Sequence, residues 1–242
     1  MAIRIEASQL ELSSFGGLSL FESLIQSEKL KGLISPLLPT NKITPEVTSW
    51  EKFRSMLYGF IAGSECISDI DIFAKDVGFT AVCGEKISSS KQLCKFLAAF
   101  NTTQCRHLNL ALIKMALNLR QDRAPKDHDF ILDIDSSDHE HFGRKFEGLR
   151  ENRKGQWCLD SFEAFDQYGF QYWSDVRPVA TFTANGATHA ISEIFSRVPR
   201  QMKRYLRADS GFCNHDVFNS CYDNNVHFVI PFRDNMVSED VE

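Results

Sequence analysis

Apolar residues in the first half of the chain recur at the spacing of amphipathic helices. Residues 18–33 and 47–63 carry apolar side chains three and four positions apart, which places them on one face of a helix. A serine run at 88–90 and a threonine pair at 102–103 precede two further runs of this kind, and such residues cap helices. We therefore expect the chain to be mainly helical as far as about Leu119.

The pattern changes at Asp129, after which the apolar runs become short and are separated by turn residues. Runs of this length predict strands. Three strands in succession imply an antiparallel meander, whereas the later alternation of strand and helix implies parallel pairing. The expected elements are strands at 130–135, 157–165 and 168–183, a helix at 187–198, a strand at 204–209, a helix from an Asn214 cap to Asn224, and a strand at 226–231.

A polar stretch that contains a proline, residues 120–128, separates the two patterns. Polar segments of this kind are typical of domain boundaries, because few buried contacts cross them. We therefore expect a helical region over residues 1–125 and a sheet region over residues 126–242. The predicted fold class is α/β, a mainly helical region followed by a mixed sheet.

Composition limits the classes of function. Hydrophobic residues make up 43% of the 242 residues, enough to form the core of one large or two small domains. The net charge of −5 gives no support for nucleic-acid binding, although a local basic patch can act in an acidic protein. The seven cysteines form no Cys-x2-Cys pair, which favours reduced thiols over zinc ligation. Without a membrane-length apolar run or a signal-peptide pattern, we expect a cytoplasmic protein with no membrane partner.

Two aspartates share one face of the first predicted strand. Side chains alternate along a strand, so Asp133 and Asp135 point the same way. Two carboxylates on one face repel each other unless a cation or a basic side chain lies between them. Because Mg²⁺ prefers oxygen ligands, metal binding is one interpretation, and a solvated acidic strand end is the other.

A third aspartate ends the predicted strand at 204–209. Asp209 precedes a Ser-Gly turn, and α/β sheets place their ligand sites at the carboxyl ends of strands. By itself, Asp209 also fits a capping residue in a strand-to-helix turn. Together with the first pair and a third acid, it would hold two metal ions about 3.5–4 Å apart, the arrangement for in-line displacement at a phosphodiester.

Two motifs resemble those of DDE transposases from bacterial insertion sequences. The run Leu-Asp-Ile-Asp-Ser-Ser-Asp-His at 132–139 resembles the family's Leu-Asp-x-Asp-x-Thr motif for the first acid, with Ser137 in place of the threonine. The run Arg-Ala-Asp-Ser-Gly-Phe at 207–212 resembles the Arg-x-Asp-Ser-Gly-Phe motif for the second acid. Segments 15–18, 63–70 and 227–230 also resemble the family, so the resemblance covers nearly the whole chain.

The resemblance implies a ribonuclease H-like sheet that is incomplete in this chain, preceded by a region that binds DNA ends. It implies that Asp135 and Asp209 are catalytic acids and metal ligands for two Mg²⁺ ions. Asp135 is preferred as the first acid because it directly precedes the Ser-Ser pair that stands for x-Thr, and Asp133 is the alternative. The implied partners are transposon ends, target DNA, and a second copy or a full-length transposase.

The family's third acid is a Glu in a Tyr-x2-Arg-x3-Glu-x6-Lys motif, and no segment of this sequence matches it. The final residues contain Glu239 and Glu242, which follow Asp209 too closely to leave room for the family's inserted region. We expect a transposase truncated by a stop codon or a frameshift, and inactive alone. The alternative is a non-catalytic fragment that binds DNA or inhibits an intact copy.

Several other clusters have a functional and a simpler interpretation. The basic residues within 144–154 and 197–207 either contact DNA phosphates or lie on ordinary solvated surfaces. The helix expected at 88–100 either presents Lys91 and Lys95 to DNA or belongs to the core. The run 138–141 is either a transition-metal site or surface. The phenylalanines expected in the core are Phe130, Phe162, Phe165, Phe182 and Phe212.

Overall fold

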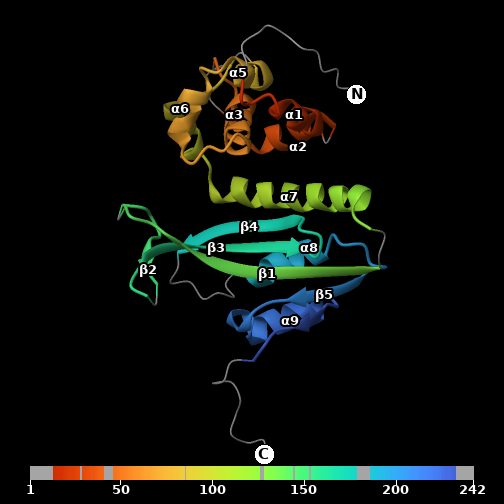
Figure 1. Ribbon diagram of the computed structural model, residues 1–242. Coiled ribbons are helices and arrows are strands. Elements are labelled where there is room, and N and C mark those ends of the chain that lie inside the picture. Colours follow the sequence, from red (N-terminus) through yellow and green to blue (C-terminus); the bar gives the residue numbers. More distant parts are fainter. Residues whose placement is uncertain are drawn as a thin grey trace, which may run out of the picture. The chain divides into compact units, whose positions relative to one another are not determined.

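The computed structural model describes most of the chain in two compact units, residues 1–108 and 109–242 (Figure 1). The units divide inside one helix, α7 (Thr102–Arg123). The described ranges are 13–27, 29–40, 46–84, 86–125, 128–143, 145–152, 154–178 and 186–232.

The first unit is helical, as the sequence predicts. Its buried core contains Leu18, Tyr58, Phe79 and Leu93. The run predicted at 18–33 is split into two helices, and Lys29 between them has a φ of 52°, the left-handed region that ends a right-handed helix. The helices of this unit are α1 (Leu18–Ser27), α2 (Leu30–Ile34), η1 (Ser35–Leu37), α3 (Ser49–Ile61), η2 (Ile67–Asp69), α4 (Ile70–Phe73), α5 (Val77–Cys83) and α6 (Ser90–Leu97).

Polar side chains fix the starts of these helices. Ser89 caps α6 by accepting a hydrogen bond from the Gln92 N–H, while the Gln92 side chain accepts one from the Ser89 N–H, so the predicted serine cap is confirmed. The predicted threonine cap of α7 is wrong. Asn101 caps this helix instead, because its side chain accepts a hydrogen bond from the Gln104 N–H at 2.9 Å and the Gln104 side chain accepts one from the Asn101 N–H at 3.1 Å.

Asp71 links α4 to the first turn of α6. Its carboxylate accepts hydrogen bonds from the Ser90 hydroxyl and from the Ser90 N–H, the latter at 2.9 Å. These bonds hold the pKa of Asp71 below its ordinary value. A carboxyl whose pKa is lower in the folded state stabilises the fold above its unfolded pKa and loses that contribution as the pH falls.

When the pH falls from about 5 to about 3, we therefore expect the free energy of unfolding of α6 to decrease more in the wild type than in Asp71→Asn. The difference should be less than about 1 kcal/mol, because the carboxylate and its partner are exposed. Amide hydrogen exchange across residues 90–97 at the two pH values measures the difference. Asp122→Asn, at an exposed position of α7, is the control that should follow the wild type. Equal losses in Asp71→Asn and the wild type would contradict the prediction.

The second unit contains a mixed sheet of six strands in the order β2-β3-β1-β5-β6, with β4 paired to β3. β1 and β4 both pair antiparallel to β3, whereas β5 pairs parallel to β1 and to β6. The predicted meander followed by parallel strands is therefore confirmed. The elements are β1 (Asp129–Glu140), β2 (Arg150–Glu151), β3 (Trp157–Asp166), β4 (Gln171–Pro178), α8 (Ala187–Phe195), β5 (Lys203–Arg207), η3 (Ser210–Phe212), α9 (His215–Asp223) and β6 (His227–Val229).

Two strand predictions need correction. β1 runs five residues beyond the predicted end at Asp135, because its ladder with β3 continues to the pair Glu140 and Cys158. The two-residue strand β2 was not predicted, since so short a run has no pattern. Part of the predicted strand 168–183 forms β4, and residues 179–183 lie outside the described residues.

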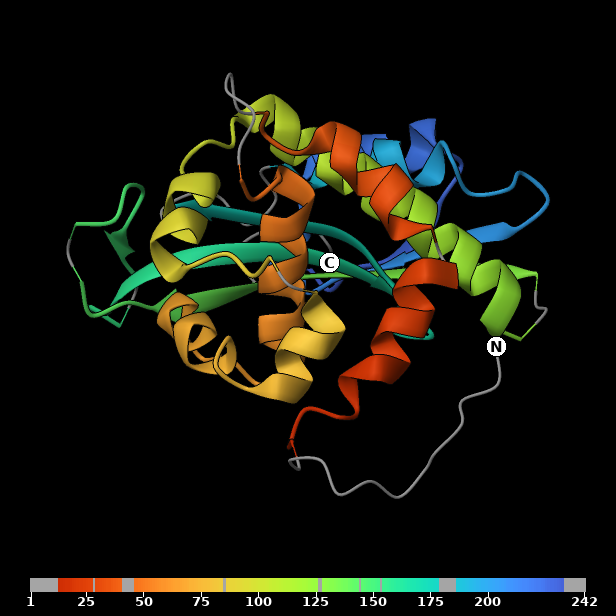
Figure 2. The same ribbon diagram turned by 90° about the horizontal axis from the view of Figure 1, so that it is seen from above.

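One face of this sheet carries the core of the unit. Phe130, Leu132 and Ile134 of β1 are buried on it together with the apolar faces of α8 and α9, and Figure 2 shows these two helices on one side of the strands. Fully burying such side chains contributes about 1.5–3 kcal/mol each. On the opposite face, Ile131 and Asp133 are partly exposed and Asp135 is exposed, so none of the described elements of this unit buries them.

α7 is held to the sheet by a buried ion pair. The Arg120 guanidinium donates to the Asp166 carboxylate at 2.9 Å and to the Asp129 carbonyl at 2.9 Å. Asp166 also accepts hydrogen bonds from the Tyr168 N–H and the Tyr172 hydroxyl. These contacts explain why α7 continues to Arg123, beyond the predicted end at Leu119.

The two compact units do not divide where the sequence pattern changes. The change from helix to strand falls within the predicted stretch 120–128. The second unit nevertheless begins at Asn109, because Ile113 and Ala116 of α7 join the core of the sheet. The assignment of DNA-end binding to residues 1–125 and catalysis to 126–242 stays a prediction.

Candidate functional site

The aspartates of β1 lie on the face of the sheet opposite to its core. Asp133 and Asp135 alternate with the buried residues Leu132 and Ile134, as the strand periodicity predicts. Asp133 is partly exposed, whereas Asp135 is exposed at the point where the strand leaves the core. Both carboxylates therefore have access to solvent.

Asp133 forms an ion pair with an arginine of the neighbouring strand. Arg207 is its register partner across the parallel ladder of β1 and β5. The Arg207 Nε lies 2.6 Å from Asp133 Oδ1 and its Nη2 lies 2.7 Å from Oδ2, a bidentate pair that raises the pKa of Arg207. Because both carboxylate oxygens accept from the guanidinium, Asp133 is poorly placed to bind a metal ion as well.

Asp209 follows the carboxyl end of β5. The pairing of β1 with β5 ends at Asp133 and Arg207, and Asp135 and Asp209 each lie two residues further along the chain. The backbone at Asp209 is extended, with φ −78° and ψ 176°, so side chains continue to alternate there. Asp135 lies within β1 and Asp209 lies two residues beyond the end of β5, both in the direction in which these parallel strands run.

Each of these two carboxylates has one oxygen engaged by the backbone. Oδ1 of Asp135 accepts a hydrogen bond from the Ser136 N–H at 2.7 Å, and Oδ1 of Asp209 accepts one from the Gly211 N–H at 2.8 Å. Within the described ranges, no hydrogen bond reaches Oδ2 of either residue. Exposed carboxylate oxygens on neighbouring strands are the donor set that a hard divalent cation such as Mg²⁺ prefers.

Nowhere among the described residues do three or more His, Cys, Asp or Glu side chains form a group that could hold a metal ion. Asp135 and Asp209 thus form at most part of a metal site in this portion of the chain.

The polar run 138–141 is built into the sheet's hairpin. The carboxylate of Asp138 accepts a hydrogen bond from Asn152, and that of Glu140 accepts one from Gln156, both at 3.1 Å. His139 Nε2 lies 2.7 Å from the Ser161 hydroxyl. These partners favour the structural interpretation of the run over a transition-metal site.

Most of the basic run at 197–207 has structural partners. Arg197 pairs with Glu193, Arg204 donates to the backbone carbonyls of Val198 and Asn224, and Arg207 pairs with Asp133. The pairing of Arg207 with Asp133 was not predicted, because it depends on a register between strands that are distant in sequence. Arg200 and Lys203 are exposed, so only these two remain suited to phosphate contact.

The helix α6 presents the two sides that the sequence predicts. Leu93 and Phe96 are buried, whereas Lys91 and Lys95 are exposed. Contact of these lysines with DNA stays a prediction. Of the phenylalanines expected in the core, Phe130, Phe162 and Phe212 are buried, Phe165 is partly exposed, and Phe182 lies outside the described residues.

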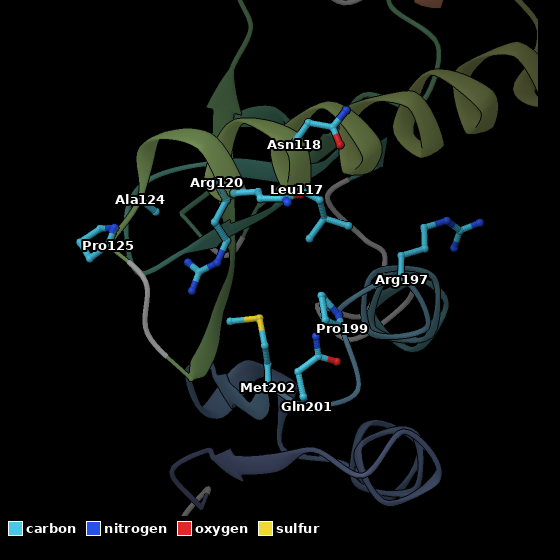
Figure 3. Close-up of a pocket in the computed structure, with 10 residues that line it drawn as sticks. Leu117, Asn118, Arg120, Ala124, Pro125, Arg197, Pro199, Gln201 and Met202 are labelled. Carbon is cyan, nitrogen blue, oxygen red and sulfur yellow. The ribbon is translucent and has the colours of Figure 1, made fainter.

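A pocket of about 530 Å³ lies between the last turns of α7 and the segment that leads from α8 into β5 (Figure 3). It adjoins the amino ends of β1 and β5, where Asp129 pairs with Lys203. Asp135 and Asp209 lie toward the carboxyl ends of these strands, so the pocket is separate from the carboxylate pair. Its lining residues are Leu117, Asn118, Arg120, Gln121, Ala124, Pro125, Arg197, Pro199, Gln201 and Met202.

No helix in the described part of the chain is long and apolar enough to cross a membrane.

A protein-family model matches nearly the whole chain. The model of the family described as transposase DDE domain group 1 matches residues 1–240. No curated protein matches the chain at a significant level.

Solved structures show weaker likenesses. A piggyBac transposase synaptic complex with hairpin DNA aligns at 10% identity and a TM-score of 0.48, over 89% of this chain and 52% of that chain. A simian T-cell lymphotropic virus intasome in complex with PP2A regulatory subunit B56 gamma aligns at 10% identity and 0.31, over 58% and 47%. A Mos1 transposase paired-end complex with the left transposon end aligns at 12% identity and 0.28, over 78% and 60%. The chain thus spans about half the length of the first two.

Proposed function

The chain belongs to the family of group 1 transposase DDE domains, and from this premise we propose that it takes part in the transposition of a bacterial insertion sequence by cutting DNA and transferring its strands. The observation that supports the proposal is the parallel register of β1 against β5, in which Asp133 pairs with Arg207, two residues before Asp135 and Asp209 respectively. The implied partners are the ends of the element and its target DNA.

In this proposal Asp135 and Asp209 are the ligands of two Mg²⁺ ions. Bound there, the ions supply activation of a water or 3′-hydroxyl and stabilisation of the leaving oxygen of a phosphodiester. The Gly211 N–H orients the Asp209 carboxylate at 2.8 Å. Arg207 engages both carboxylate oxygens of Asp133, which supports Asp135 over Asp133 as the first acid. A third carboxylate, a Glu from outside the described residues, completes the site.

A non-catalytic role is the second candidate. It is favoured by the lack, among the described residues, of a third metal-binding side chain beside Asp135 and Asp209. In this role the helical region occupies transposon ends, or the chain pairs with an intact copy and inhibits it. Lys91 and Lys95 on the exposed side of α6 are the proposed phosphate contacts.

One assay separates the two candidates. Residues 1–242 are incubated with DNA that carries the terminal sequences flanking the gene, with Mg²⁺ or with EDTA, and both binding and nicking are followed. Metal-dependent nicking supports a complete active site, and salt-sensitive binding without nicking supports the non-catalytic role. A chain that neither binds nor nicks this DNA would overturn the catalytic role and the occupation of transposon ends. Translating the DNA beyond codon 242 in three frames then tests for the missing Glu motif.

A further inference from the structure

The hairpin that follows Asp135 projects from the sheet as an arm. β1 is buried on one face as far as Ile134, but its last four residues are all exposed. The ladder with β3 nevertheless continues to the pair Glu140 and Cys158, and β2 pairs with the start of β3. Figure 1 shows β2 and the loop before it beyond the end of β4. Leu149 and Cys158 are buried at the base of this arm, whereas the last four residues of β1 have no buried face.

Side-chain contacts stiffen the arm. Asn152 donates to Asp138 and to the Gln156 side chain, each at 3.1 Å, and Gln156 donates to Glu140 at 3.1 Å. A polar network of this kind ties both strands of the hairpin together. The arm therefore presents its tip in a fixed position relative to Asp135, on the same continuous strand.

The tip carries two phenylalanines with different surroundings. Phe146 packs against the His141 ring, with 4.1 Å between the centroids. Phe142, by contrast, is 92% exposed, the most exposed of the large apolar side chains described. Exposing a whole aromatic ring to water at the end of a stiff arm is unfavourable, which points to a partner for this ring.

The segment that follows Phe142 is basic, whereas the strand before it carries Asp138 and Glu140. Residues 142–154 contain five Lys or Arg against two Glu, a net charge of +3 in a chain whose net charge is −5. Lys145, Arg150 and Lys154 are exposed on the described part of the arm. Positive charge around a protruding ring complements phosphates on either side of a base step.

We propose that the arm is a DNA wedge in which Phe142 inserts between base pairs while Lys145, Arg150 and Lys154 contact the flanking phosphates. Apolar side chains that enter a base step unstack and kink the duplex. The inference rests on the proposed function only in taking DNA as the partner. Local unstacking lowers the cost of drawing a strand toward the carboxylates at the root of the arm.

The strand also sets the reach of the wedge. Phe142 lies seven residues after Asp135, and a strand rises about 3.3 Å per residue, so the ring lies within about 23 Å of the candidate site. At 3.4 Å per base pair, this is about seven base pairs of duplex. The unstacked step is therefore expected within about seven base pairs of the phosphate that reacts.

The test compares the affinity of residues 1–242 for two short duplexes of the same sequence, one fully paired and one with a central mismatched pair. A wedge prefers DNA that already unstacks easily, so the wild type is expected to bind the mismatched duplex about tenfold more tightly. Phe142→Ala is expected to bind the two duplexes equally. Lys154→Ala is expected to weaken both alike and to reduce the salt dependence.

Two further variants make the outcomes distinguishable. Phe60→Ala removes another exposed ring, 63% exposed on α3, and should keep the preference. Asp135→Asn should also keep it, so a failure of the metal site leaves the wedge testable. If Phe142→Ala retains the preference, or the wild type has none, the wedge is wrong. If Phe142→Ala instead lowers the mass in sedimentation, without changing DNA binding, the ring joins copies of the chain and the wedge is overturned.

Discussion

Asn substitution of Asp135 or Asp209 is expected to weaken Mn²⁺ binding by residues 1–242 more than about 100-fold, since loss of even the outer-shell partners of metal ligands costs about 10- to 100-fold. Each residue contributes a carboxylate oxygen to one sheet edge, and the amide that replaces it is neutral. Electron paramagnetic resonance of free Mn²⁺ during a titration measures the affinity without requiring cleavage of DNA.

Asp133→Asn is the matched control, on the same strand and the same face. Both oxygens of Asp133 accept from Arg207, so this substitution should weaken Mn²⁺ binding less than about tenfold. The remaining effect arises because the positive charge of Arg207 is no longer neutralised and repels the metal ion. The opposite ranking, with Asp133→Asn the more damaging, would make Asp133 the first acid and would contradict the assignment drawn from the register.

Replacing Arg120 by Met is expected to lower the free energy of unfolding of the sheet unit by about 3–5 kcal/mol, the range for breaking a buried ion pair by removing one partner. Asp166 has a fully buried side chain, so its carboxylate would remain in the interior without its cation. The hydrogen bonds from Tyr168 and Tyr172 compensate only part of this charge. Urea unfolding followed by hydrogen exchange of the β1 amides gives the change for this unit.

Arg197→Met provides the comparison for this prediction. Arg197 also pairs with an acid, Glu193, but the arginine side chain is 38% exposed. Its removal is expected to cost less than about 1 kcal/mol, as is usual for surface pairs. Equal effects of the two substitutions would show that burial does not determine the strength of the Arg120 pair.

The sequence predicts local structure well where a pattern spans several residues. Alternation of apolar and polar positions is sufficient to place Asp133 and Asp135 on one face of β1. It is not sufficient to choose between them, because both side chains satisfy the same period. The choice depends on Arg207, 74 positions away, and on a parallel register that no local pattern encodes.

The sequence also does not predict side-chain contacts between elements that are distant along the chain. Arg204 and Arg207 belong to a basic run that suggests phosphate contact, yet the structure engages Arg204 with backbone carbonyls and Arg207 with Asp133. The cap of α7 is a different case. Asn101 and Gln104 form a local capping pair. Their spacing is visible in the sequence, but the adjacent threonines are equally plausible caps by residue type.

The alternation of side chains along β1 also determines which length changes this gene can accumulate. One residue inserted between Phe130 and Ile134 would turn Asp135 toward the buried side of the sheet, since each strand position alternates between faces. One residue inserted in the loop around Phe142 would leave that parity intact. Among related copies of the gene, insertions of one residue within β1 are therefore expected only where the proposed site at Asp135 is no longer under selection.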